Sequence, residues 1–428
     1  MSKSEPRVSL ILAAILIGFA AISLVYSFVT PLKFGPDEPA HFIYVRSLAT
    51  TMSPPPISDT QTYTEDSTAT HEGHQPPLYY AAMAVPYAAL NAFGLPIDVI
   101  WRVLRLLNIG IGALWIYWVY RLAREFFEND SYALATAAFV ALVPIAPYTA
   151  GVLNNDNLIA LLFTWAMAPI VRLFKAEKLP TRDAAIMGLA MGLAMLAKAQ
   201  GLILAAVLVV ATSAVWRRRQ YGRIDGMVRA VGIALGVAAI VSGWWYVRCW
   251  IVYGTPMPHS LHEPLLPHGM GSLLAYPLLG LNAIWYSSST TYGYFWTPFW
   301  LVWKYMSWAY YFWPIVGLNA AVLLGLVPRL RRGGVDTKTL WLLVFTGALT
   351  YAMWLRYTLV VDKMANLQGR LFLPVAAIVG ILFVLGVDGW LTSEKAKRVG
   401  VVAWLILLLA ANAAVLACDH VFYAGGGV

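Results

Sequence analysis

Long apolar stretches separated by short polar connections make up most of the chain. Eleven of them are long enough to cross a membrane at about 20 residues per crossing. A span in lipid must pair its own backbone hydrogen-bonding groups, which favours α-helices. The pattern therefore predicts an all-α polytopic membrane protein, with a single integral membrane domain over residues 1–428 and about 11 transmembrane helices that begin near Val8, Val99, Ser131, Asp156, Asp183, Gly201, Met227, Trp308, Thr339, Leu371 and Val401.

A further apolar stretch, from Pro76 to Leu95, is predicted to lie at the membrane interface without crossing it. Its leading prolines and its paired tyrosines, Tyr79 and Tyr80, suit a helix that lies along the interface or enters it partway. A crossing here would move the basic cluster at residues 217–219 to the opposite side of the membrane. We therefore expect interfacial helices in the first outer loop.

The distribution of charge predicts the orientation. The 428-residue chain is 60% hydrophobic and 12% charged, with a formal net charge of +9. In a soluble protein such an excess would suggest binding of nucleic acid. Here the basic residues stand in short loops between apolar stretches, which is the pattern that orients membrane proteins. With a cytoplasmic N-terminus, 20 of the 30 lysines and arginines fall on the inner side. We expect a multi-pass protein of the plasma or inner membrane whose first span, Val8 to Thr30, is retained.

This orientation leaves two long segments on the outer face, residues 31–98 and residues 248–307, together with all seven histidines. The second segment is rich in aromatic residues, which are typical of an interfacial belt and would also suit a sugar or lipid groove. The two cysteines, Cys249 and Cys418, cannot form a disulfide framework and are expected to be packing residues. Functional residues are therefore expected among the outer polar positions.

The first outer segment opens with two adjacent carboxylates, Asp37 and Glu38, followed by His41. A helix that begins at Asp37 would accept Pro39 in its first turn, and the Asp37 side chain would cap free amide groups. His41 falls on the same helical face, four residues on. Because capping requires neither Glu38 nor His41, a site at the membrane boundary is the sharper interpretation. Asp37 and Glu38 are the predicted catalytic residues, and His41 is predicted to bind substrate.

A second polar motif, from His71 to Tyr80, leads into the interfacial helix. Its prolines would fix a rigid entry, so that the motif could close over the acidic pair. His74 and Gln75 are predicted to bind substrate. The spacing of His71, Glu72 and His74 also allows a zinc site, although loops often show such a spacing by chance.

Further candidates stand at the outer ends of spans. Asp156 would either cap the fourth span or bind substrate, and Lys198 would snorkel to lipid headgroups. Arg370 stands at a helix N-terminus, where a cation opposes the helix dipole and a nearby anion such as phosphate would resolve the conflict. Arg248 and Lys304 are predicted to bind the same substrate phosphate, with anchoring at the interface as the alternative.

These motifs resemble those of membrane glycosyltransferases of the GT-C type, which use a sugar carried on a polyprenyl phosphate. Asp37-Glu38 with His41-Phe42 looks like the acidic motif of the protein O-mannosyltransferases, and an eleven-span layout also suits them. The segment from His74 to Tyr79 resembles the Glu-Lys-Pro-Pro-Leu segment of the lipid A aminoarabinose transferases. Gln75 stands where those enzymes carry a lysine thought to meet the donor phosphate, so phosphate binding would have to come from elsewhere.

A resemblance that covers most of the chain is to an uncharacterised prokaryotic membrane family with a Pro-Asp-Glu-Pro-Ala-His motif near its start. Four motifs carry this resemblance, in the same order along the chain. They stand here as Pro36 to His41, Pro76 to Tyr80, Arg248 with Tyr253-Gly254, and Gln368 to Arg370.

The resemblance implies an inverting transfer on the outer face. Asp37 would accept a proton from an acceptor hydroxyl while that oxygen attacks the anomeric carbon of the sugar, and outer cations would stabilise the departing phosphate. The implied partners are a polyprenyl-phosphate-linked sugar, a glycan, lipid or protein acceptor, and membrane lipid, with no nucleic acid. No cofactor is expected to be required, although Asp37 and Asp156 could hold a divalent cation as oxygen ligands.

Two other functions stay open on the sequence. A transporter or flippase of a lipid-linked anion would also need outer cations and many spans, and it should carry polar residues at mid-membrane depth. A non-catalytic subunit of envelope glycan assembly could keep the grooves without depending on Asp37 for turnover.

Overall fold

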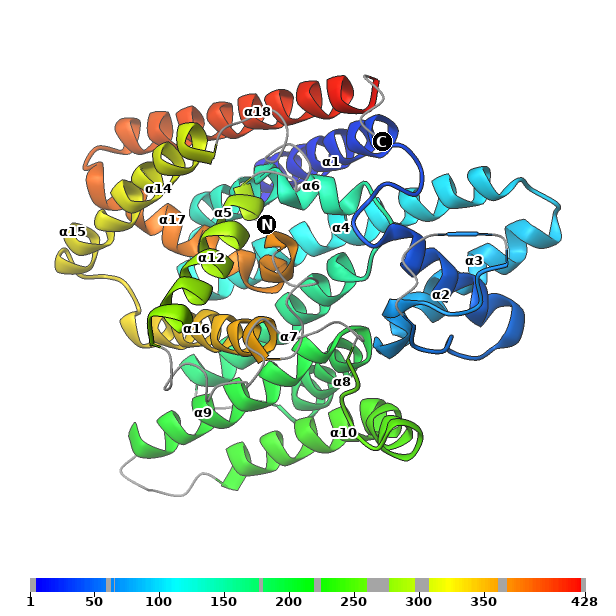
Figure 1. Ribbon diagram of the computed structural model, residues 1–428. Helices are drawn as coiled ribbons and strands as arrows, with labels where there is room; N and C mark the ends of the chain where they lie inside the picture. Colours follow the sequence, from blue (N-terminus) through cyan, green and yellow to red (C-terminus); the bar gives the residue numbers. More distant parts are fainter. Residues whose placement is uncertain are drawn as a thin grey trace.

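The computed structural model is a helical bundle (Figure 1). It describes residues 5–58, 63–64, 66–176, 180–218, 225–259, 277–296, 308–360 and 368–424. The predicted all-α class is confirmed, because the described residues form helices with one isolated β-bridge, between Ile57 and Thr70. In chain order the elements are α1 Glu5–Val29, α2 Glu38–Thr51, the 3₁₀ helix η1 His71–His74, α3 Leu78–Ala92, α4 Ile97–Phe127, α5 Asp130–Leu142, α6 Ile145–Ala150, α7 Asp156–Ala176, α8 Thr181–Ala197, the 3₁₀ helix η2 Ala199–Leu202, α9 Ile203–Arg218, α10 Asp225–Tyr253, α12 Pro277–Trp296, α14 Trp308–Leu324, α15 Leu326–Arg331, α16 Thr337–Val360, the 3₁₀ helix η3 Gly369–Val375, α17 Ala376–Trp390 and α18 Glu394–Ala424.

Nine segments of the described chain are long and apolar enough to cross a membrane, and each coincides with a predicted span. They are Pro6–Val29, Ile97–Phe127, Asp156–Lys175, Ala199–Arg218, Gly226–Tyr253, Phe312–Arg331, Thr337–Leu359, Gly369–Trp390 and Glu394–Ala424. The other two predicted spans correspond to α5 and α8, which have 13 and 17 residues. Both are shorter than the roughly 20 residues that a crossing needs, so the count of eleven is not confirmed.

Backbone breaks explain why these two helices are short. Pro144 follows α5, and a residue before proline is driven out of the helical region, as Val143 is with φ −63° and ψ 119°. The chain then resumes helix in the short α6. At the end of α8, Lys198 is extended, with φ −162° and ψ 147°. The second break brings Lys198 beside Asp156 at the start of α7.

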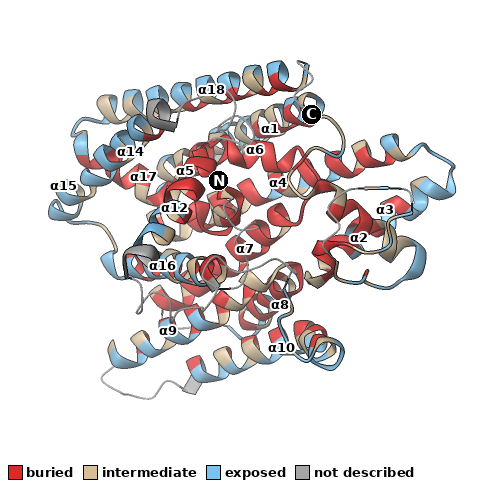
Figure 2. Cartoon of the chain, in the orientation of Figure 1, coloured by how far each residue is buried: buried red, intermediate tan, exposed pale blue. Residues whose placement is uncertain are grey.

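Two spans form the centre of the bundle (Figure 2). In the apolar window of α7 and in that of the η3–α17 span, 83% of the residues are buried, against 11% in α1 and 17% in α18. Because their flanks are covered by other helices, the residues at their ends lie inside the molecule. Asp156 begins α7 and Arg370 lies in η3, so both are enclosed by protein.

The first outer segment folds onto one end of the bundle, where α2 and α3 lie side by side (Figure 1). α3 has 15 residues and is not among the candidate spans, in agreement with the prediction that this stretch does not cross. The two helices share a cluster of buried aromatic side chains, in which the rings of Phe42 and Trp101 stack at 3.9 Å and those of Tyr44 and Tyr80 at 3.8 Å. This packing fixes the start of α2, where the acidic pair lies.

The opposite ends of the same spans carry a separate set of ion pairs. Asp388, near the end of α17, accepts the ammonium of Lys397 at 2.9 Å and the guanidinium of Arg329 at 2.5 Å. Arg172, near the end of α7, pairs with Glu125 of α4. These contacts tie connecting segments together at the end that is distant from Asp37 along each helix.

Candidate active site

Asp37 stands in the turn between α1 and α2, with its backbone in the left-handed region at φ 57°. Residues other than glycine seldom adopt this conformation. Its carbonyl accepts the amide of His41 at 3.0 Å, as expected at an N-cap, but its side chain caps no amide group. Side-chain capping by Asp37, the alternative to a functional role, is therefore not found. The side chain turns to other partners instead.

Arg370 holds that carboxylate from the far end of the sequence. Its Nη2 pairs with Oδ2 of Asp37, and its Nη1 lies 3.1 Å from Oδ2 of Asp156. Gly369 allows η3 to come this close to α12, because a Cβ there would lie 2.2 Å from the backbone nitrogen of Phe295. The anion expected beside Arg370 is thus present within the chain, as two carboxylates.

Asp156 is a branch point between two cations. Besides Arg370, it accepts the ammonium of Lys198 at 2.6 Å, and the Lys198 side chain is only 13% exposed. The side chain of Asn154 accepts the amide of Asp156 at 2.9 Å and so performs the local turn-forming role. Asp156 is therefore left to bind cations, and Lys198 is an internal ion-pair partner where a snorkelling residue was predicted.

Glu38 is fully buried and forms a two-point ion pair with Arg105 of α4. The guanidinium donates to its two oxygens at 2.7 and 2.6 Å. The amide of Leu153 donates to the same carboxylate at 2.9 Å, and that of Gly35 at 3.2 Å. Arg105 also donates to three backbone carbonyls at the end of α1, which belong to Ser27, Thr30 and Pro31. This geometry supports a positioning role for Glu38, because its acceptor sites are already used.

The loop that carries η1 brings His71 and Glu72 against Asp37. The Nε2 atom of His71 lies 3.4 Å from Oδ1 of Asp37 and 3.6 Å from Oε1 of Glu72. His74 has other partners. Its Nδ1 contacts the backbone carbonyl of His71 at 2.7 Å, and its Nε2 contacts the side-chain amide nitrogen of Gln75 at 3.2 Å. The potential metal ligands within the described chain are therefore Asp37, His71 and Glu72, and His74 does not join them.

His41 lies in the same enclosed region, 1% exposed. Its Nδ1 contacts the hydroxyl of Tyr80 at 2.9 Å, and its Nε2 has no hydrogen-bond partner among the described residues. The neighbouring Tyr44 hydroxyl donates to the carbonyl of Gln75 at 3.0 Å. Tyrosine hydroxyls thus join α2 to α3 and to the loop before it.

Electrostatics keep the acidic groups ionised. Burial raises the pKa of Asp37, but Arg370 and His71 outweigh it and hold the pKa well below its usual range. Burial also raises the pKa of Glu72, and the three nearby histidines bring it below its ordinary value. Burial lowers the pKa values of His41 and His74, which favours their neutral forms. At neutral pH the site therefore holds two ionised carboxylates, Asp37 and Glu72.

The two remaining predicted cations stand apart from these contacts. Arg248 lies on α10, with its guanidinium 5.1 Å from the ring centre of Trp245 and 5.9 Å from that of Tyr253. Its Nη1 is buried and has no hydrogen-bond partner among the described residues. Lys304 lies outside the described residues. Two of the three predicted phosphate-binding cations, Arg248 and Arg370, lie within the described residues. Of these two, Arg370 is the one in contact with Asp37.

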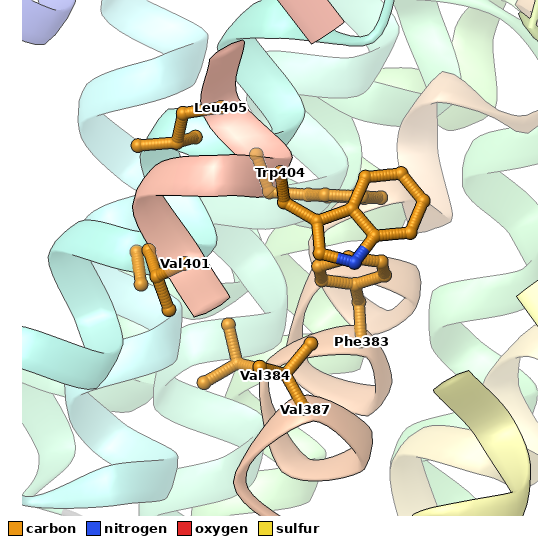
Figure 3. A pocket seen from close by; sticks show the side chains of 8 residues that line it. Phe383, Val384, Val387, Val401, Trp404 and Leu405 are labelled. Carbon is orange, nitrogen blue, oxygen red and sulfur yellow. The ribbon is translucent and has the colours of Figure 1, made fainter. Parts of the chain in front are cut away.

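Two cavities flank the structure without coinciding with this cluster. A polar pocket of about 460 Å³ is lined by Lys33, Tyr63, Thr64, Pro96, Ile97 and Asp98, and it opens beside the first outer segment. A second cavity, of about 10 Å³, lies between α5, α17 and α18, where the indole of Trp404 crosses the ring of Phe383 (Figure 3). Its lining residues are all apolar, so it is a packing gap.

Comparison with solved structures shows the fold. The chain aligns with ArnT from Cupriavidus metallidurans in the apo state at a TM-score of 0.53 and 17% identity, covering 99% of this chain and 75% of that one. ArnT bound to undecaprenyl phosphate aligns at a TM-score of 0.52 and 16% identity, covering 96% of this chain and 74% of that one. The apo oligosaccharyltransferase of Archaeoglobus fulgidus aligns at a TM-score of 0.52 and 14% identity, covering 96% of this chain. The chain spans 56% of the length of that enzyme.

The GT-C resemblance predicted from the sequence is therefore confirmed at the level of the fold. No curated protein matches the chain. A family model matches residues 46–379, which is most of the chain and begins just after the acidic motif. On this match, the chain belongs to the membrane family described as "Predicted membrane protein (DUF2142)".

Proposed function

We propose that this chain is an inverting membrane glycosyltransferase that moves a sugar from a polyprenyl-phosphate donor to an acceptor on the outer face of the membrane. The observation that carries the proposal is the contact of Asp37 with Arg370, which joins a carboxylate and a buried guanidinium from opposite ends of the chain. The fold adds support, since ArnT, which has a similar fold, has been solved bound to undecaprenyl phosphate.

Arg370 is the proposed phosphate ligand. A guanidinium offers a planar set of donors that suits phosphate oxygens. Arg370 already binds two carboxylates, and a phosphate oxygen could take the place of Asp37 while Asp156 stays in contact at 3.1 Å. Lys198 keeps Asp156 fixed by its 2.6 Å contact. The guanidinium would therefore stay oriented during the exchange.

Asp37 is the proposed base. The acceptor hydroxyl oxygen forms a bond to the anomeric carbon as the bond from that carbon to the phosphate oxygen breaks, and the bonding electrons leave with the phosphate. The hydroxyl proton passes to the Asp37 carboxylate. While Arg370 is paired with Asp37, the pKa of this carboxylate is held low, so loss of that contact to the phosphate would make Asp37 a stronger base. Binding of the donor would thus prepare the base.

The test is transfer by the purified full-length protein in detergent, with a panel of polyprenyl-phosphate sugars. Asp37→Asn should abolish transfer, and Asp98→Asn, an exposed carboxylate in the same outer segment, is the matched control that should keep it. Transfer that survives in Asp37→Asn would exclude the proposed base. If no donor is consumed under any condition but a lipid-linked anion moves across vesicles, the protein is a transporter. Binding of donor without turnover or transport would indicate an assembly subunit.

A further inference from the structure

With His71 neutral, as a metal ligand must be, the cluster around Asp37 has an excess of negative charge. Three carboxylates, Asp37, Glu72 and Asp156, face two cations, Arg370 and Lys198. The neighbouring pair of Glu38 and Arg105 is balanced in itself. Buried carboxylates require compensation, because removing a charge from water is costly unless a partner of opposite sign is present. One further positive charge is needed for balance, and a divalent ion would reverse the sign of the cluster to suit an anionic phosphate.

The side-chain positions fit a metal ion. His71 Nε2, a carboxylate oxygen of Asp37 and one of Glu72 lie within 4.8 Å of one another. The separations of 3.4 and 3.6 Å from His71 to the two carboxylates exceed the roughly 2.7–2.9 Å of a charge-assisted hydrogen bond. They match the edges of a tetrahedron, which are about 3.3–3.6 Å when each ligand lies about 2.0–2.2 Å from a central zinc ion.

A second observation points to a missing ligand. Glu72 is buried, at 7% exposure, and its Oε2 has no hydrogen-bond partner among the described residues. An ionised buried oxygen without a partner costs free energy, and metal coordination would satisfy it. The η1 loop that carries Glu72 is held by its own contacts, including that of His74 with the carbonyl of His71 at 2.7 Å. The ligand positions are therefore set before an ion arrives.

We propose that His71, Glu72 and Asp37 form a binding site for a divalent ion of the zinc class. One nitrogen and two carboxylate oxygens favour zinc over magnesium, which prefers oxygen ligands. Three protein ligands leave a fourth position open, as in sites where zinc binds a substrate oxygen. This inference deepens the proposed function by placing the acceptor hydroxyl at that position, where a bound ion supplies Lewis acidity. Asp37 faces the ion through Oδ1. Its Oδ2 is paired with Arg370 and becomes free for the acceptor proton once a phosphate oxygen has taken its place beside the guanidinium.

Metal binding can be tested without turnover. The full-length protein, stripped with a chelator and titrated with Zn²⁺ in detergent, should bind one equivalent that is absent from His71→Ala and Glu72→Gln. Loss of a ligand should weaken affinity by more than the roughly 10–100-fold expected for loss of an outer hydrogen-bond partner. His420→Ala, an exposed histidine on α18, is the matched control and should bind as the wild type does. Co²⁺ should give visible absorption bands of tetrahedral coordination, and these should disappear in His71→Ala. Size-exclusion profiles confirm that each variant is folded.

The outcomes separate this site from the proposed function. Failure of the wild-type protein to bind Zn²⁺, or equal binding by the wild type and both ligand variants, would overturn the metal site. In that case Asp37-dependent transfer could still be observed. Zn²⁺ binding that depends on His71, with no donor consumed by the protein, would support the metal site and reject the transferase.

Discussion

The buried ion pair between Glu38 and Arg105 gives a sharp test of how the site is held. Glu38→Gln removes the charge with little change in volume. The native carboxylate accepts two N–H groups from Arg105 and one each from Leu153 and Gly35. A glutamine side chain has one acceptor oxygen, and its NH₂ group would face N–H donors from which it cannot accept a hydrogen bond. We therefore expect a large loss of stability.

The magnitude follows from burial. Both side chains of the pair are 0% exposed. Removal of one partner of a buried ion pair costs about 3–5 kcal/mol, which is a large part of an ordinary folding stability of about 5–15 kcal/mol. Arg105→Met should cost at least as much, because it also leaves the carbonyls of Ser27, Thr30 and Pro31 without their donor. The double variant should lose less than the sum of the two single losses.

Thermal unfolding in detergent, followed by size-exclusion chromatography after heating, measures these effects. Glu128→Gln is the matched control, since Glu128 pairs with Lys175 at 2.9 Å but is 79% exposed, and its melting temperature should change little. The inferred ion pair with Arg105 would be refuted by either of two results. One is a Glu38→Gln variant that melts like this control, and the other is a double variant whose loss of stability equals the sum of the two single losses. Normal melting combined with loss of transfer would instead support the catalytic role predicted for Glu38 from the sequence.

The other two predictions concern a helix contact and the phosphate ligand. Gly389→Ala should destabilise the protein by about 1–3 kcal/mol, because its Cβ would lie 1.7 Å from the carbonyl oxygen of Gly325. Gly347→Ala meets no atom within 4 Å, so equal melting of the two variants would contradict this packing argument. Arg370→Lys should lower kcat/KM for the donor by roughly 10–100-fold, since one ammonium cannot replace the charge-assisted hydrogen bonds of a guanidinium. Exposed Arg331→Lys is the control in the same transfer assay, and an unchanged kcat/KM for Arg370→Lys would remove Arg370 from donor binding.

The spans could be predicted from the sequence because their length and apolar character are local properties. All nine candidate spans of the described chain coincide with predicted ones. The two that differ, α5 and α8, end at backbone breaks that the apolar pattern did not register. Pro144 was a signal for the first of these, since a proline restricts the residue before it. The extended backbone of Lys198 had no comparable signal.

The contacts of the site could be predicted only in part. Asp37, Asp156 and Arg370 were found as polar residues at the ends of apolar stretches, which is a local property. Their pairing depends on how α7 and η3 pack against the first outer segment, and the sequence does not specify that packing. Arg105 was missed although a signal existed, because an arginine within an apolar stretch needs a partner. That partner, Glu38, had been interpreted as a catalytic residue.

The position of Arg370 limits what the site can bind. Arg370 is a buried guanidinium with two carboxylate partners. If a neutral ligand displaced either carboxylate, the binding would cost free energy, because the displaced carboxylate and the cation would both lack compensation. An anionic ligand can replace Asp37 beside Arg370 without leaving the guanidinium unpaired, since Asp156 remains at 3.1 Å. The freed Asp37 then needs a positive neighbour or a proton. An acceptor hydroxyl supplies the proton and His71 lies 3.4 Å away, so in the proposed reaction the entry of the phosphate and the demand for a proton at Asp37 are coupled.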